Sequence, residues 1–182
     1  ESDFQFSLMH SEYFAGIAAY DYAALATKID TASTIGFSFI RFGVDDIPNT
    51  TQLIDSEGNI DFNRVTSFSA SDYAGLISYA RKSKIEGLSY GANIKIIHRN
   101  VGDFADAWGF GFDVGAQYQR NNWRFAAVGR DITSTFNAWT SNLDEETKQV
   151  FALTNNEIPE NSVEITLPEL ILGVNRAFVV SR

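Results

Sequence analysis

Apolar and polar positions alternate strictly over residues 108–119. Glycine, Asp113 and glutamine hold the odd positions, and the even positions carry Trp108, Phe110, Phe112, Val114, Ala116 and Tyr118. A period of two predicts a β-strand with one apolar face and one polar or bare face. The run exceeds the about 5–6 residues usual in soluble proteins, and it suffices for the about 9–11 residues of a tilted membrane strand. Trp108 and Tyr118 end the apolar face, where membrane strands carry interfacial aromatics.

The same alternation recurs along the chain and predicts about eight antiparallel strands without an internal repeat. They cover residues 3–9, 17–27, 34–42, 71–81, 88–99, 108–119, 123–133 and 163–180. Three connections, 28–33, 82–87 and 119–122, are predicted to be tight polar turns. Two others, 43–66 and 134–161, are predicted to be long loops, and the remaining two are of modest length.

These connection lengths favour one architecture. In an up-and-down meander, alternate connections lie at opposite ends of the sheet, so the tight turns gather at one end and the long loops at the other. Outer-membrane barrels have this arrangement, with short periplasmic turns and longer extracellular loops. The fold class predicted is therefore all-β, an antiparallel up-and-down transmembrane β-barrel. A soluble ligand-binding barrel, whose apolar face points inward, is the alternative.

A membrane barrel assigns opposite solvents to the two faces of its strands. We expect polar side chains to face the lumen and apolar ones to face lipid. The lumen-facing set is Asn93, Lys95, Asp113, Gln117, Arg124 and Arg130. The lipid-facing set is Tyr90, Ile94, Phe110, Phe112, Val114 and Phe125. Lys95 and Asp113 are expected to pair between adjacent strands, and lumen glycines to leave room for bulky neighbours.

Composition narrows the function classes. The 182 residues suffice for one domain, and the net charge of −9, with a pI near 4.6, provides no basic patch for nucleic acid. The absence of cysteine excludes disulfides and thiolate metal sites. No run of eighteen apolar residues is present, so no membrane-spanning helix is predicted.

No motif predicts catalysis or a cofactor. His10 and His98 are the two histidines, and nothing in the sequence sets them beside a nucleophile, so we expect no enzyme activity. The acidic stretch with Asp45, Asp46, Asp55, Glu57 and Asp61 lacks EF-hand spacing, so a solvated loop is expected rather than a Ca²⁺ site. Gly87, Gly91, Gly109 and Gly111 lie within or beside predicted strands and do not form a phosphate loop. No cofactor or metal is predicted.

The predicted loop 134–161 holds a helix signal. Ser141 or Asn142 is suited to cap a helix with acids in its first turn. Long loops without regular structure are unusual unless functional or disordered. We therefore predict a partner-binding loop carried by Phe136, Trp139, Phe151 and Leu153.

Several segments resemble a known family. They are SDFQFSLMHSEYFAGIAAYDYAAL, IGFSFIRFG, YAGLISYARK, GLSYGANIKIIHR and NEIPENSVEITLPELILG. Together they resemble the PorV family (PorV/PorQ-like) of Bacteroidetes outer-membrane proteins, which are FadL-like barrels of about fourteen strands linked to the type IX secretion system. The resemblance implies that residues 1–182 are a single barrel region lacking an N-terminal segment and C-terminal strands.

The resemblance also implies a role and a location. PorV-like proteins accept secreted cargo or accompany the secretion translocon, and FadL relatives transport hydrophobic small molecules. The expected partners are thus outer-membrane lipid, a secretion translocon and a secreted cargo domain. The expected location is the bacterial outer membrane, with the long loops extracellular.

Overall fold

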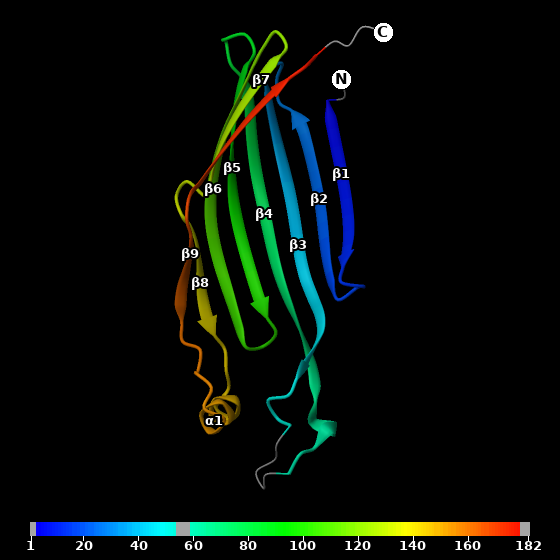
Figure 1. The fold of residues 1–182 in the computed structure, drawn as a ribbon, viewed down its shortest axis with the longest axis vertical. Coiled ribbons are helices and arrows are strands. Elements are labelled where there is room, and N and C mark those ends of the chain that lie inside the picture. The colour runs from blue at the N-terminus through cyan, green and yellow to red at the C-terminus, as the bar shows by residue number, and fades with distance from the viewer. Residues whose placement is uncertain (1–2, 54–58, 179–182) are drawn as a thin grey trace.

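The computed structural model describes residues 3–53 and 59–178, and its main feature is one antiparallel up-and-down sheet (Figure 1). Asp55 and Glu57, from the acidic stretch, lie outside the described residues. The sheet has ten strands: β1 Phe4–Tyr13, β2 Ala18–Lys28, β3 Ser33–Asn49, β4 Thr66–Lys82, β5 Leu88–Val101, β6 Ala105–Arg120, β7 Trp123–Arg130, β8 Thr135–Ser141, β9 Ser162–Thr166 and β10 Glu169–Arg176. A 3₁₀ turn, η1 Phe62–Arg64, and a helix, α1 Glu145–Leu153, complete the described elements.

Sequential strands pair from β1 to β7, and β7 then pairs with β10. The first half of β6 pairs instead with β8, which pairs with β9. Thus β7 and β8 run along the two halves of β6 as one interrupted strand path, and β9 and β10 form the next. The ten strands follow eight paths, which explains why the alternation predicts about eight strands.

The predicted loop 134–161 was wrong over its first part, because residues 135–141 form β8. Its sequence TFNAWTS has apolar residues at both odd and even positions, so the period-two pattern is weak. The predicted strand 123–133 ends early, at Arg130, and the predicted strand 163–180 is divided at Leu167 and Pro168. Proline cannot donate to a sheet ladder, so it suits such a break.

The three predicted tight turns are confirmed, and they lie together at the upper end of the sheet in Figure 1. We call this the turn end and the opposite one the loop end. The connections 14–17 and 102–104 are also short, although they lie at the loop end. The loop predicted over 43–66 is shortened because β3 continues to Asn49 after a register shift between Val44 and Ile47. The asymmetry between the ends therefore rests on the β3–β4 and β8–β9 connections.

Helix α1 lies at the loop end (Figure 1) and confirms the predicted helix, but its cap differs from the predicted one. The Asp144 carboxylate accepts a hydrogen bond from Thr147 N at 2.7 Å. That bond holds the pKa of Asp144 below its usual value. Among the described residues, no helix is long and apolar enough to span a membrane.

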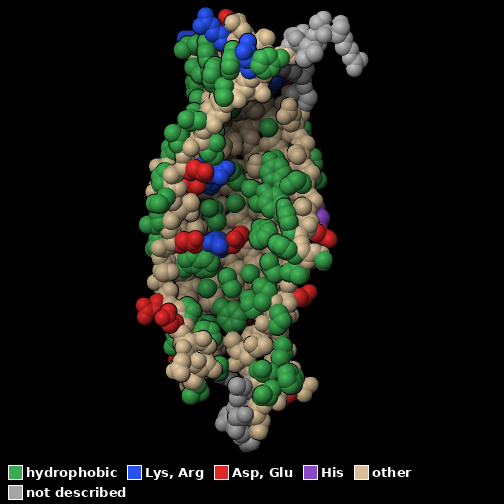
Figure 2. All heavy atoms as spheres, in the orientation of Figure 1, with side chains coloured by type: hydrophobic (Ala, Val, Ile, Leu, Met, Phe, Trp, Pro, Cys, Tyr) green, Lys and Arg blue, Asp and Glu red, His purple; other side chains and the backbone are tan. Residues whose placement is uncertain are grey.

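The sheet is curved, and Figure 2 shows its hollowed, concave face. It is not closed, because β1 and β10 are the two ends of the strand order and are not paired with each other. Within the described residues, Ala18, Ala107 and Leu143 are the buried hydrophobic residues, so no conventional apolar core forms. Many large apolar side chains are exposed instead, among them Trp108, Phe110 and Phe125.

Candidate functional site on the concave face

Strand register places the two predicted sets of residues on opposite faces. Asn93 lies opposite Asp113, and Ile94 lies opposite Phe112, so alternation puts the first pair on one face and the second on the other. We extended this assignment through the registers of the paired strands from β5 to β10. The whole predicted lumen set then lies on the concave face, and the whole predicted lipid set lies on the convex face. All of the convex set are exposed except Phe112, which is half-buried.

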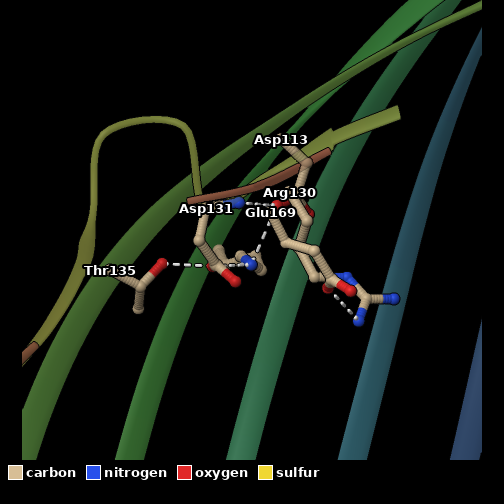
Figure 3. Close-up of polar contacts among 6 residues, drawn as sticks. Asp113, Arg130, Asp131, Thr135 and Glu169 are labelled. Atoms are coloured by element: carbon tan, nitrogen blue, oxygen red, sulfur yellow. Dashed lines mark hydrogen bonds and ion pairs between the residues drawn. The ribbon is translucent and has the colours of Figure 1, made fainter. Parts of the chain in front are cut away.

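A buried charge cluster lies on the concave face where β7 gives way to β8 (Figure 3). The Lys95 Nζ is 2.9 Å from Asp113 Oδ1 and also pairs with Asp131. The hydroxyl of Thr135 donates to Asp131, and Asp131 N donates to Asp113 Oδ1 at 2.8 Å. The side chains of all three charged residues are at most 13% exposed. The predicted Lys95–Asp113 pair is confirmed, whereas the participation of Asp131 and Thr135 was not predicted.

The backbone at this break turns sharply. Asp131 and Ser134 have φ of 52° and 57°, in the left-handed region that few residues other than glycine and Asn or Asp adopt. Ser134 N donates to Asp131 O at 2.8 Å, and Ile132 N donates to Phe112 O at 2.9 Å. The turn therefore stays attached to β6 while it directs the Asp131 carboxylate at Lys95.

A second charge cluster spans β4, β5, β8 and β9 nearer the loop end. Arg99 lies between Asp72 and Glu164, with nitrogen–oxygen distances of 2.9 and 2.8 Å. Its guanidinium also lies 5.1 Å from the ring centroid of Trp139, whose indole N–H donates to Glu164 at 3.1 Å. Charged side chains are visible across the concave face in Figure 2.

This arrangement corrects the predicted partner-binding loop. Trp139 and Phe136 lie in β8 rather than in a loop. Phe136 is on the convex face opposite Phe110, whereas Trp139 is on the concave face with Arg99. Phe151 and Leu153 lie in α1, and Leu153 is 84% exposed. The four residues do not form one surface, because side chains three apart in a strand point to opposite faces.

Two glycines of β6 on the concave face, Gly109 and Gly111, leave room for side chains of β8, as predicted. A Cβ at Gly109 would overlap the Asn137 side chain, and one at Gly111 would overlap Thr135. Close approach of β8 to β6 therefore depends on the absence of side chains at both positions.

The other residues of the predicted lumen-facing set lie outside the Lys95 and Arg99 charge clusters. Arg130 pairs with Glu169 at 3.5 Å (Figure 3), and both side chains are more than half exposed. Arg124 donates to Gln119 at 3.0 Å. Asn93 helps line a hollow of about 340 Å³ with Asp113. Gln117 is exposed. Together these residues line a polar surface on the concave face.

The convex face carries its own polar row near the loop end. One residue from each of six successive strands stands in direct register: His10, Asp21, Arg41, Tyr73, His98 and Trp108. His10 Nδ1 is 2.7 Å from Asp21 Oδ1, and the His98 and Trp108 rings stack with centroids 4.3 Å apart. The two histidines lie four strands apart in the sheet order, so they do not meet. Within the described parts of the chain, no group of three or more His, Cys, Asp or Glu residues is placed to hold a metal ion.

No family model, curated protein or solved structure matches this chain.

Proposed function

We propose that this chain forms part of the wall of a bacterial outer-membrane β-barrel, with its convex face in lipid and its concave face toward a polar lumen. The observation that carries the proposal is the reversal of the usual burial pattern. Phe110, Ile94 and Phe125 are at least 40% exposed on one face, while Lys95 and Asp113 are largely buried on the other. Monomeric soluble proteins rarely expose continuous apolar patches of this kind. A bilayer is a solvent that accommodates them.

The height of the apolar surface supports the proposal. Trp108 and Tyr118 bound the apolar side of β6, and ten residues of strand span about 33 Å along its axis. At the about 35–45° tilt of membrane barrels, this gives about 25 Å along the barrel axis, the height of the apolar band in such proteins. Aromatic residues lie at both limits, as membrane interfaces favour.

Barrel closure is part of the proposal. The sheet described here leaves β1 at one edge and β9 with β10 at the other. Exposed strand edges invite aggregation, and a closed barrel abolishes them. We therefore propose that further strands complete the wall, in a FadL-like barrel of about fourteen strands.

For the biological role, we propose the function implied by the resemblance to PorV: a cargo-accepting or translocon-associated subunit of type IX secretion, without enzyme activity. The long loops would then be extracellular. Partner contacts would fall at the loop end, where helix α1 presents the exposed Leu153 side chain. The aromatic residues of β8 are assigned to the wall instead.

A FadL-like transporter of hydrophobic small molecules is the second candidate, because the concave face is not uniformly polar. Tyr20, Tyr22 and Phe42 of β2 and β3 share this face with Tyr13 of β1, by alternation and register. The Tyr13 and Phe42 rings lie 6.5 Å apart. Such a surface could line a path for an apolar solute. A soluble ligand-binding barrel fits less well, because it would bury the convex apolar residues.

Extraction and co-purification test the proposal. The full chain, expressed in a Bacteroidetes host, should stay in outer membranes through alkaline carbonate and should dissolve only with detergent. Under mild detergent it should co-purify with the secretion translocon. Release by carbonate would contradict the membrane assignment. Membrane retention without translocon or cargo, together with uptake of a hydrophobic solute, would favour the transporter.

Labelling tests the orientation, because the chain has no cysteine. A cysteine at Glu157 in the β8–β9 connection should react with an impermeant maleimide on whole cells. One at Lys84, in a tight turn, should react only after lysis. The opposite result would invert the topology.

A further inference from the structure

The turn end of the convex face combines two features that together fit one ligand. The first is an apolar groove of about 470 Å³ over β6, β7 and β10. Its convex floor contains Ala116 and Ala127, which lie in register, and Tyr118, Phe125 and Val174 form the adjacent row. Small side chains beside large ones produce a channel suited to a hydrocarbon chain.

The second feature is a row of arginines at the end of that groove. Arg120 and Arg176 each lie in register with Trp123, one on either side of it. The Arg176 guanidinium is 4.9 Å from the Trp123 ring centroid. Arg81 lies in register with Tyr90 on the neighbouring strands β4 and β5. Arginine matches phosphate geometry well, and tryptophan favours the membrane interface.

Charge distinguishes this end of the convex face from the other. From Trp108 to Arg120 on β6, and along β7 and β10, no convex position carries an acidic side chain. Near the loop end, the convex row instead includes Asp21, paired with His10 and Arg41. An anionic group would therefore be attracted to the turn end.

We propose that this groove and arginine row bind an anionic phospholipid of the leaflet on the turn side. One acyl chain lies along the alanine floor, and the headgroup phosphate lies between Arg120 and Arg176 beside Trp123. The inference rests on the proposed membrane location and extends it to a specific lipid class.

Lipid retention by the full chain tests the site. Protein extracted in mild detergent is mixed with phosphatidylglycerol or phosphatidylcholine, and bound lipid is measured by native mass spectrometry. We expect phosphatidylglycerol to be retained about tenfold better, since each interfacial arginine adds to the attraction. The double variant Arg120→Gln/Arg176→Gln should lose this preference. Arg124→Gln, on the concave face of the same strand end, should keep it.

A second variant tests the groove separately from the charge. Ala127→Phe fills the groove floor on the convex face and leaves both arginines in place. Phosphatidylglycerol with brominated acyl chains should quench Trp123 fluorescence in a Trp108→Phe/Trp139→Phe background, and Ala127→Phe should reduce that quenching.

Equal retention of the two lipids by a membrane-integrated protein would overturn the lipid site while leaving the membrane proposal intact. An equal loss in Arg124→Gln and in the double variant would also overturn it, by showing that total charge alone decides binding. Release of the protein by carbonate would instead remove the membrane premise.

Discussion

The convex and concave faces of the same strands satisfy their side chains in opposite ways. On the concave face, Lys95 has two carboxylate partners and little exposure, and Arg99 has two more. On the convex face, Phe110 of β6 and Ile94 of β5 lie on neighbouring strands, and both remain exposed. Charged groups on the concave face thus have partners within the protein, whereas the large apolar groups on the convex face are exposed. This difference is the observation on which the proposed membrane location rests.

The largest effect is expected where the concave face holds its deepest charge. Lys95→Ala leaves Asp113 and Asp131 side by side without a cation. Breaking a buried ion pair typically costs about 3–5 kcal/mol. Urea unfolding of the full chain in lipid vesicles should show a loss of this order. Glu169→Gln is the matched control, because its pair with Arg130 is more than half exposed and is expected to contribute about 0–1 kcal/mol. Equal losses in both variants would contradict the difference in burial.

The next largest effect is expected when an arginine replaces an apolar residue on the convex face. Phe112 lies near the middle of the apolar side of β6, so Phe112→Arg should cost about 2–4 kcal/mol if that position lies near the bilayer midplane. Asn93→Arg, on the concave face, faces a hollow and Asp113 and should change the free energy of unfolding much less. A spin label at Phe112 should report lipid rather than water. Tolerance of arginine there, with a water-exposed label, would reverse the assignment of the faces.

A smaller effect is expected when a methyl group is added at an enclosed glycine rather than at an open one. Gly109→Ala places a methyl group against Asn137 where β8 approaches β6, and such overpacking typically costs about 1–3 kcal/mol. Gly75→Ala, on the convex face, meets no atom within 4 Å and should be nearly neutral. The same unfolding measurement compares them. If both variants are neutral, the close approach of β8 to β6 is not required for stability.

The face on which a side chain lies can be predicted from the sequence, whereas contacts that depend on the alignment of distant strands cannot. Alternation within one strand decides which face a residue takes, so the local pattern correctly predicts that Lys95 and Asp113 lie on the face opposite to the convex aromatics. The contacts of Asp131 with Lys95 and Thr135 depend on how β8 aligns with β6. That alignment joins residues far apart in sequence, and β8 itself alternates too weakly to be recognised.

The helix cap shows the same limitation on a smaller scale. Ser141 and Asn142 are good capping residues, but both already form hydrogen bonds at the end of β8. Ser141 ends β8 and its N–H donates to Asn161, while Asn142 N donates to Phe104 O at the β5–β6 connection. The cap therefore moves to Asp144. Only knowledge of where β8 ends could have excluded the earlier candidates.

The smallest effect concerns α1, which belongs to neither face. The Thr147 N–H lowers the pKa of the exposed Asp144, so the cap stabilises α1 above the ordinary aspartate pKa of about 3.9 and is lost as pH falls through the lowered value. Hydrogen exchange in residues 145–153, corrected for intrinsic rates, should therefore show less protection at pH 3 than at pH 7. Asp144→Asn keeps a capping oxygen without a titrating group and should remove this pH dependence, whereas Asp144→Ala should lower protection at both pH values. At pH 7, exchange in β5 and β6 should not respond to either substitution, because the hydrogen-bond partner of Asp144, Thr147, belongs to α1 rather than to these strands. Unchanged pH dependence in Asp144→Asn would assign the effect to another group at the loop end.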